Sequence, residues 1–271
     1  MTPAEFAFVC RLVRDRSAVV LEPGKEYLVE ARLAALANEL QFASAGELVA
    51  AVRDTQNGAL STRIVEAMVT TETLFFRDRT PFDVLRDAVL PDLISRRAAA
   101  RTLNVWSAAC STGQEPYSFV LLLRQHFPEL TGWKVNVLAT DLSGQVLARA
   151  REGRYNQVEV SRGLPTTLLT EYFEPTGAEW QLRAGVRGAV EFRVLNLARP
   201  WPLLPPTDLV FLRNVMIYFD SETKKALLNR IARVLRPDGY LLLGSTETIL
   251  TLGSPFSRVE HLKGGFHQFA K

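Results

Sequence analysis

The chain has 271 residues, of which 47% are hydrophobic and 23% are charged. That length and apolar content suffice to bury a substantial core in one large domain, or in a large and a small one. The formal net charge of +3 is only mildly basic, which favours an ordinary soluble surface and argues against nucleic-acid binding.

Cysteine and histidine usage argues against a disulfide framework and a metal site. Cys10 and Cys110 are the two cysteines, and none of the three histidines groups with them at metal-ligand spacing. No apolar run reaches the roughly 18 residues that a membrane span needs, and the N-terminus lacks a secretory signal pattern. We therefore expect a soluble, cytoplasmic, monomeric protein that binds no metal and inserts into no membrane.

Residues 1–70 are predicted to form a small, all-helical domain. Apolar residues recur at helical spacing at Phe6–Val13 and Leu28–Leu36, and again in two shorter stretches near 48–52 and 64–68. Lys25 and Arg32 lie seven residues apart, hence on one face of the second helix. This face is either a solvated surface or a local patch for an acidic partner, and the sequence favours neither.

Residues 71–102 are expected to connect this domain to the next. Val69–Asp78 holds three threonines, two adjacent phenylalanines and Arg77. The stretch is either a linker that its phenylalanines anchor to the core, or a segment that lies over a ligand site with Arg77 pointing inward. Composition alone favours the linker. Thr80, followed by Pro81, is expected to cap a helix that reaches about Ser95.

The next domain is predicted to begin with a strand, a tight turn and a helix. Residues 103–109 form an apolar run typical of a buried strand, small residues follow up to Gly113, and Glu115 begins an apolar-periodic helix. Small residues in such a turn let a ligand approach the backbone. A second buried strand at 135–139 leads to Asp141, whose carboxylate can accept hydrogen bonds from both ribose hydroxyls of a nucleoside.

An antiparallel hairpin is predicted in the middle of this domain. A helix from near Ser143 to Arg151 and a short helix ending near Phe173 come first. The strands 180–182 and 190–194 then flank a turn-rich stretch, which favours a hairpin over a further crossover.

The last elements are expected to bring polar residues to one edge of the sheet. A buried strand at 208–214, a helix at 223–235, a strand at 240–244 and a closing hairpin at 256–270 follow in order. Ligands of open α/β sheets bind at the carboxyl ends of the strands. That edge would collect Thr112–Glu115, Asp141, Asn196 and Arg213–Tyr218.

The turn after the first strand indicates the kind of ligand. It lacks the G-x-G-x-x-G spacing that suits a pyrophosphate. This favours an adenosine ligand without a diphosphate, such as S-adenosylmethionine. It argues against the alternative of a nicotinamide-dependent oxidoreductase on a similar sheet.

Three long motifs lie in these segments: TETLFFR at 71–77, WSAACSTGQEPYS at 106–118 and FLRNVMIYFD at 211–220. In this order they resemble the motifs of the chemotaxis receptor glutamate methyltransferases of CheR type. The resemblance extends to ATD at 139–141, to Asn196-Leu197 and to LRPDG at 235–239, and so spans nearly the whole chain.

The resemblance implies a helical domain at 1–70, a connecting segment at 71–102 and an α/β domain at 103–271. The last would be a Rossmann-like class I methyltransferase domain with a small antiparallel subdomain inserted at about 175–195. S-adenosylmethionine would be the cofactor and S-adenosylhomocysteine the product. The implied substrates are glutamate side chains on the cytoplasmic signalling region of membrane chemoreceptors, methylated during sensory adaptation.

The resemblance also implies site residues. Arg77 and Tyr218 would be catalytic, with Tyr218 near the transferred methyl group. Our hypothesis is that Asp141 holds the ribose and Glu115 the methionine amino group. The family usually has Asn at the position of Thr71. The implied cofactor contacts are Thr71, Thr73, Arg77, Glu115, Asp141, Asn196, Leu197, Arg213 and Asn214.

This chemistry needs no catalytic His or Cys pair. A glutamate carboxylate is already ionised at pH 7 and needs no general base. Opposite charges disappear when it attacks a sulfonium, so apolar walls such as Phe75, Phe76 and Tyr218 favour the reaction. Arg77 or Arg213 suits a carboxylate bidentately, and the sequence leaves open whether that carboxylate belongs to the substrate or to the cofactor. A second alternative, a signalling adaptor that binds the cofactor without catalysis, is disfavoured because Arg77 and Tyr218 are intact.

Overall fold

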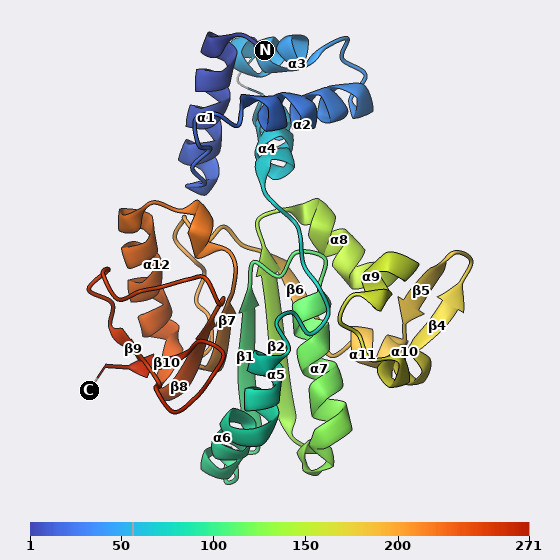
Figure 1. Cartoon of the computed structure of the whole chain (residues 1–271), viewed down its shortest axis with the longest axis vertical. Helices are drawn as coiled ribbons and strands as arrows, with labels where there is room; N and C mark the ends of the chain where they lie inside the picture. The colour runs from blue at the N-terminus through green and yellow to red at the C-terminus, as the bar shows by residue number, and fades with distance from the viewer. Residues whose placement is uncertain (56, 271) are drawn as a thin grey trace. The chain divides into compact units, whose positions relative to one another are not determined.

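The computed structural model describes residues 1–55 and 57–270, which divide into two compact units (Figure 1). The helical unit comprises Met1–Thr70 together with Tyr218–Lys224. The sheet unit comprises Thr71–Ile217 and the described chain from Lys225 onward. In the described chain, none of the helices combines the length and the apolar character needed to cross a membrane.

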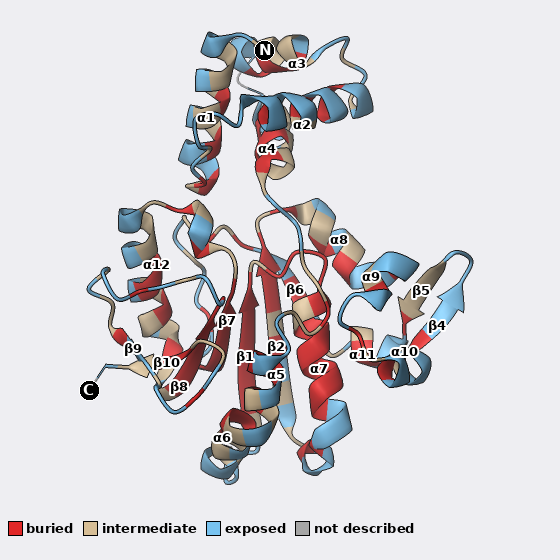
Figure 2. Ribbon diagram, in the orientation of Figure 1, coloured by how far each residue is buried: buried red, intermediate tan, exposed pale blue. Residues whose placement is uncertain are grey.

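Within residues 1–55 and 57–70, the helical unit has four helices, which agrees with the all-helical prediction for this domain. Thr2 begins the first helix with a capping box, since its hydroxyl accepts from the Glu5 N–H while the Glu5 carboxylate accepts from the Thr2 N–H. Buried faces of the helices meet in a small core that includes Val13, Leu33 and Ile64 (Figure 2). The helices are α1 (Pro3–Ser17), α2 (Glu26–Glu39), α3 (Ala45–Thr55) and α4 (Gly58–Met68).

The sheet unit is organised by a seven-stranded sheet with strand order β6-β2-β1-β7-β8-β10-β9. The pairs among β6, β2, β1, β7 and β8 are parallel, and β10 is antiparallel to both β8 and β9. The expected Rossmann-like architecture and the closing hairpin are confirmed. The strands of this sheet are β1 (Thr102–Ala108), β2 (Lys134–Asp141), β6 (Val190–Val194), β7 (Thr207–Leu212), β8 (Leu235–Leu243), β9 (Phe256–Arg258) and β10 (Phe266–Phe269).

Helices cover both faces of this sheet, so β7 is buried throughout and β1 is buried after its first residue (Figure 2). Leu209 and Phe211 of β7 pack into the main core with residues of the helices that follow residue 80, while the intervening Val210 and Leu212 are buried on the other face. The helices are α5 (Thr80–Val84), η1 (Leu85–Val89), α6 (Leu90–Arg97), α7 (Gln114–His126), η2 (Pro128–Leu130), α8 (Gly144–Glu152), α9 (Gln157–Ser161), α10 (Thr166–Tyr172), α11 (Ala184–Arg187), η3 (Met216–Tyr218) and α12 (Ser221–Val234).

The predicted hairpin between 180–182 and 190–194 is wrong. β5 (Glu179–Leu182) pairs instead with β4 (Phe173–Thr176) and β3 (Arg154–Asn156) in a separate three-stranded antiparallel sheet. β6 joins the main sheet, parallel to β2. The small antiparallel subdomain implied by the resemblance is present, but its strands span 154–182. The helix α11 separates β5 from β6 and so prevents the direct turn that a hairpin needs.

The helix predicted from Thr80 also differs in detail. Thr80 is the first helical residue, and Arg79, with φ +46°, occupies the cap position. The helical stretch continues through the π-helical turn η1 and α6 to Arg97. Pro81 lies in the first turn, as expected, where its missing N–H needs no partner.

Candidate functional site

The turn after β1 is a tight loop with left-handed residues. Ala109, Ser111 and Gly113 all have positive φ, at 59°, 51° and 92°. Glycine is required at position 113 for two reasons. L side chains rarely adopt its φ of +92°, and a Cβ atom here would lie only 3.1 Å from Ala150 Cβ and from the Tyr117 ring. The backbone of this turn is therefore fixed at the point where a ligand can approach it closely.

Asp141 holds this turn from the carboxyl end of β2. Its buried carboxylate accepts from the Ser111 N–H at 2.9 Å and from the Ser143 N–H at 3.0 Å. The Ser111 hydroxyl donates in turn to the Thr71 carbonyl oxygen at 2.6 Å. One carboxylate thus fixes the turn after β1 and the start of α8, and Ser111 links both to the segment that begins at Thr71.

Asn196 and Leu197 follow β6 beside Asp141. The Leu195 N–H donates to the Asp141 carbonyl oxygen at 2.9 Å, which joins the ends of β6 and β2. The Asn196 side chain accepts from the Ala198 N–H at 2.9 Å, and Leu197 is buried. The structure therefore brings Asp141, Asn196 and Leu197 to one end of the sheet.

Glu115 and Arg213 form a buried ion pair at the same end. Glu115 lies in the first turn of α7, where its carboxylate accepts from the Ser107 hydroxyl at 2.7 Å and from Arg213 Nη1 at 3.2 Å. Arg213 follows β7, and its side chain is 1% exposed. Arg213 Nη2 also donates to the Asp78 carboxylate at 2.8 Å and to the Arg77 carbonyl oxygen at 2.9 Å. Three segments far apart in the sequence meet at this guanidinium.

Burial raises the pKa of the Glu115 carboxyl. The guanidinium of Arg213 and the hydroxyl of Ser107 oppose that shift, and the charge of Arg77 acts in the same direction as Arg213. A cationic ligand group beside Glu115 would add to these stabilising contacts.

Residues 76–79 have a backbone that side chains rarely adopt. Phe76, Asp78 and Arg79 have φ values of +48°, +69° and +46°. Phe75 is fully buried, and the Phe76 N–H donates to the Ser118 hydroxyl at 2.9 Å. Together with the bonds from Arg213, these contacts fix a conformation that costs energy.

The half-buried Arg77 guanidinium donates to the Glu72 carbonyl oxygen at 3.2 Å. The segment 71–78 is thus anchored by a phenylalanine, as the linker interpretation expects, while its backbone is bonded to the carboxyl-end residues Ser111 and Arg213. Thr73 lies half-buried in the same segment.

Asn214 follows Arg213 and is also left-handed, with φ +59°. Its N–H donates to the Glu247 carboxylate at 2.8 Å. Tyr218, the last residue of η3, belongs to the helical unit, where its carbonyl oxygen accepts from the Val20 N–H at 2.9 Å. Of the predicted site residues, the sheet unit thus brings Glu115, Asp141, Asn196, Leu197, Arg213 and Asn214 to the carboxyl ends of its strands, and the segment with Thr71 and Arg77 is hydrogen-bonded to that end through Ser111 and Arg213.

Two buried polar atoms test whether this site fits the predicted cofactor. Within residues 1–55 and 57–270, no protein atom hydrogen-bonds to Arg213 Nε or to Asn214 Oδ1. One is a donor and the other an acceptor, and buried groups of this kind need partners. The methionine part of S-adenosylmethionine carries a carboxylate and an ammonium group, so the donor set fits it.

Sequence reasoning missed Asp78, Ser111 and Glu247. Asp78 directly follows the arginine of the first motif, and Ser111 lies inside the second, so motif position alone could have suggested both. Glu247 stands four residues after the end of β8. The rule that selected Asp141, an acid at a strand's carboxyl end, would also have selected Glu247 if extended to the residues that follow the strand.

Comparison with known proteins covers nearly the whole sequence. The family described as "CheR methyltransferase, SAM binding domain" matches residues 71–264, and "CheR methyltransferase, all-alpha domain" matches residues 4–69. Chemotaxis protein methyltransferase 1 of Pseudomonas aeruginosa is 41% identical, over 95% of this chain and 94% of that protein.

Two further relatives have similar coverage. Chemotaxis protein methyltransferase Cher2 of Pseudomonas putida is 39% identical, over 92% of each chain. Chemotaxis protein methyltransferase 1 of Vibrio cholerae is 38% identical, over 94% of this chain and 93% of that protein.

Proposed function

Because this chain belongs to the CheR methyltransferase family, we propose that it methylates glutamate carboxylates on the cytoplasmic signalling region of membrane chemoreceptors. The predicted cofactor, S-adenosylmethionine, and the predicted class, a methyltransferase of chemotaxis, are confirmed by the family matches. The glutamate acceptor and the receptor are the parts that this proposal adds. The enzyme would act in the cytoplasm, where that part of the receptor lies.

We assign the cofactor to the carboxyl ends of β1, β2, β6 and β7. In this assignment Asp141 holds the ribose, Asn196 and Leu197 lie beside it, and Glu115 binds the methionine ammonium. The raised pKa of the Glu115 carboxyl supports this pairing, since burial has left a carboxylate that a cation would stabilise. Arg213 Nε and Asn214 Oδ1 supply a further donor and acceptor.

The contrast between two arginines carries the proposal for the acceptor. Arg213 is committed to the Glu115 and Asp78 carboxylates and to a backbone carbonyl. Arg77 is half-buried and donates to the backbone at Glu72. A planar guanidinium binds a carboxylate through two parallel hydrogen bonds, and Arg77 keeps more than one donor for this, whereas both Nη atoms of Arg213 are bonded within the protein. An anionic acceptor, such as a glutamate side chain, suits it.

The reaction requires positioning more than proton transfer. S-adenosylmethionine supplies a methyl group on a sulfonium, and the carboxylate oxygen displaces the sulfur in line. A glutamate carboxylate is ionised at neutral pH, so no side chain has to remove a proton. Holding the acceptor oxygen in line with the methyl carbon can contribute several kcal/mol to the rate. We propose that Arg77 orients the acceptor and that Tyr218 contributes near the methyl group.

Labelled methyl transfer tests this function. The full chain is incubated with methyl-labelled S-adenosylmethionine and receptor cytoplasmic fragments, and base-labile methyl esters are then measured. We expect labelled esters with the wild type and at least about a hundredfold less with Arg77→Ala, from the loss of a charge-assisted bidentate contact.

The matched control is Arg162→Ala, an exposed arginine paired with Glu72, which should retain activity. Label that resists base would refute the carboxylate acceptor. Full activity of Arg77→Ala would refute the role of Arg77.

A further inference from the structure

Glu247 accepts four backbone hydrogen bonds with one side chain. Its Oε2 accepts from the Gly244 and Asn214 N–H groups, both at 2.8 Å. Its Oε1 accepts from the Val215 N–H at 3.0 Å and from the Met216 N–H at 2.7 Å. A carboxylate offers about four acceptor sites, so the protein backbone uses all of them. Such a side chain serves to hold the backbone.

These bonds fix the turn that leaves β7. Three successive N–H groups, those of residues 214–216, converge on the carboxylate, and the fourth comes from the residue after β8. Asn214 is left-handed, a conformation that costs free energy unless its surroundings hold it. Glu247 therefore joins the ends of two neighbouring strands and keeps Asn214 in this conformation.

Gly244 shows how closely these groups approach one another. A Cβ atom at this position would lie 2.8 Å from Glu247 Oε2, 2.9 Å from the Asn214 backbone nitrogen and 3.1 Å from Asn214 Nδ2. Two of these three contacts are shorter than real Cβ atoms tolerate, and one involves backbone. Glycine is thus needed here for space, so that the carboxylate can reach the turn.

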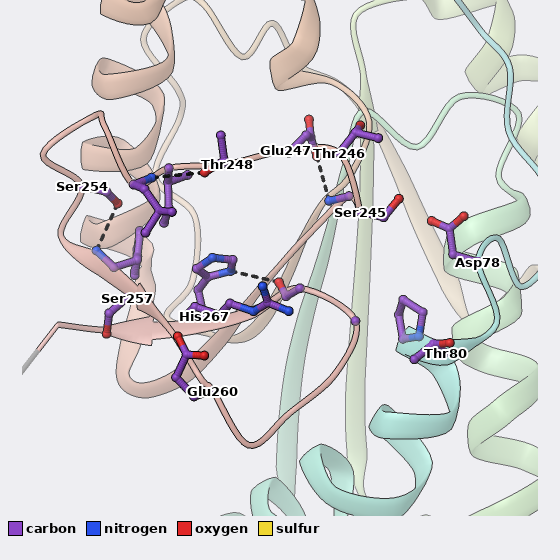
Figure 3. A pocket seen from close by; sticks show the side chains of 18 of the residues that line it. Asp78, Thr80, Ser245, Thr246, Glu247, Thr248, Ser254, Ser257, Glu260 and His267 are labelled. Atoms are coloured by element: carbon purple, nitrogen blue, oxygen red, sulfur yellow. Dashed lines mark hydrogen bonds between the residues drawn. The ribbon is translucent and has the colours of Figure 1, made fainter.

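Glu247 also lines a cavity of about 900 Å³ (Figure 3). Glu247 and Asp78 are both in its lining, and each is also hydrogen-bonded to the turn after β7, through Asn214 and Arg213. Figure 3 shows Glu247 beside Ser245 and Thr246, with its bond to the Gly244 nitrogen dashed. The turn after β7 is therefore bonded to two residues of the cavity lining, and its shape depends on Glu247.

We infer that Glu247 is a positioning residue for cofactor binding, which sets the backbone of residues 214–216 and so aims the Asn214 side chain. The inference rests on the proposed assignment of Asn214 to the cofactor. Asn214 Oδ1 is buried and, in the described part of the chain, has no protein partner. The orientation of the Asn214 side chain therefore decides whether a donor group of the ligand can bond to this oxygen.

The test is the affinity for S-adenosylhomocysteine, measured by titration calorimetry on the full chain. Glu247→Gln keeps the size of the side chain, but its single amide oxygen can serve only two of the four N–H groups. We expect Kd to rise at least about tenfold, because buried donors are left unpaired and the turn relaxes. The matched control is Glu260→Gln, the same change at an exposed glutamate in the cavity lining, for which Kd should stay within about twofold.

A second variant perturbs the same turn and leaves residue 247 a glutamate. Gly244→Ala should also raise Kd about tenfold, because its methyl group displaces Glu247 or Asn214. Its control is Gly58→Ala, where a Cβ atom would meet nothing within 4 Å. A substitution that only lowered stability would leave Kd unchanged at temperatures where the variant is folded.

A double-mutant cycle separates positioning from other effects. If Glu247 acts through Asn214, Glu247→Gln should cost little further affinity in an Asn214→Ala background. Fully additive losses would overturn the inference, as would wild-type affinity in Glu247→Gln or Gly244→Ala. Wild-type protein that does not bind S-adenosylhomocysteine at all would refute the cofactor assignment itself, so the two failures are distinguishable.

Discussion

Replacing Arg213 by methionine is the most direct test of how the site is held together. Met keeps much of the apolar stem but removes the charge that faces Glu115 and Asp78. The side chains of Arg213 and Glu115 are 1% and 12% exposed, so this pair is effectively buried. Removing one partner of a buried pair costs about 3–5 kcal/mol, because the other charge stays buried without compensation.

The second ion pair of Arg213 adds little to this cost. The Asp78 side chain is 38% exposed, and pairs open to solvent contribute on the order of 0.2–1 kcal/mol. We therefore expect Arg213→Met to destabilise the sheet unit by about 3–5 kcal/mol in total. With a denaturant dependence near 3 kcal/mol per molar, the urea midpoint should fall by about 1–2 M.

Tryptophan fluorescence is the appropriate probe of this unfolding. All four tryptophans, at positions 106, 133, 180 and 201, belong to the sheet unit, so the signal reports that unit. Arg162→Met is the matched control, because Arg162 and its partner Glu72 are both more than half exposed. It should change stability by less than about 0.5 kcal/mol. A loss below about 1 kcal/mol for Arg213→Met would refute the reasoning.

Three further predictions concern other charged groups of the sheet unit. Asp141→Ala should weaken S-adenosylhomocysteine binding by about 1–3 kcal/mol in calorimetry, and Asp141→Asn by less, because Asn keeps one acceptor for the turn at Ser111; equal losses would contradict this. Burial raises the native pKa of Glu115 above its unfolded value, so the native state retains this proton to higher pH. Stability from this group should therefore fall as pH rises from the unfolded pKa through the raised one. In Glu115→Gln, the decrease of the urea midpoint with rising pH should disappear. An unchanged decrease would exclude Glu115 as its cause. Arg97→Ala should cost about 1–3 kcal/mol in the same assay, because the buried Asp208 carboxylate loses the guanidinium 2.6 Å away but keeps Arg236 Nε at 3.1 Å and the Asn104 N–H at 2.7 Å; a loss under about 0.5 kcal/mol would count against this.

The sequence predicted the strands of the main sheet well because their burial is simple. β1 and β7 are covered on both faces, so apolar residues occupy both faces of each strand instead of alternating with exposed polar ones. The carboxyl-end rule then selected Glu115, Asp141, Asn196 and Arg213, and the fold does bring these residues to one end of the sheet. This part of the site follows from topology alone.

The small antiparallel sheet could not be predicted in the same way. In β4 the last three residues, 174–176, are exposed, and β3 is three residues long with only Tyr155 buried. Neither stretch carries an alternating apolar pattern. β5 and β6 do, but an edge strand of a parallel sheet and one arm of a hairpin look alike over four or five residues. Partner choice was decided by tertiary packing.

Side-chain partnerships were the least predictable part of the site. Arg213 bonds to Asp78, which is 135 residues away in the sequence, and Glu247 to Asn214, which is 33 away. No local pattern relates such residues, and motif reasoning left open whether the carboxylate held by Arg77 or Arg213 belongs to the substrate or to the cofactor. Coordinates were needed to show that Arg213 is occupied by Glu115 and Asp78.

The position of β1 between β2 and β7 has a consequence for biosynthesis. β2 follows β1 soon along the chain, but β7 begins only at Thr207. At translation rates of about 5–20 residues per second, the roughly hundred intervening residues take about 5–20 s to emerge from the ribosome. During that interval one edge of an apolar strand has no neighbour and can pair with other nascent chains. Recovery of intact enzyme from an overproducing cell should therefore depend on its supply of chaperones.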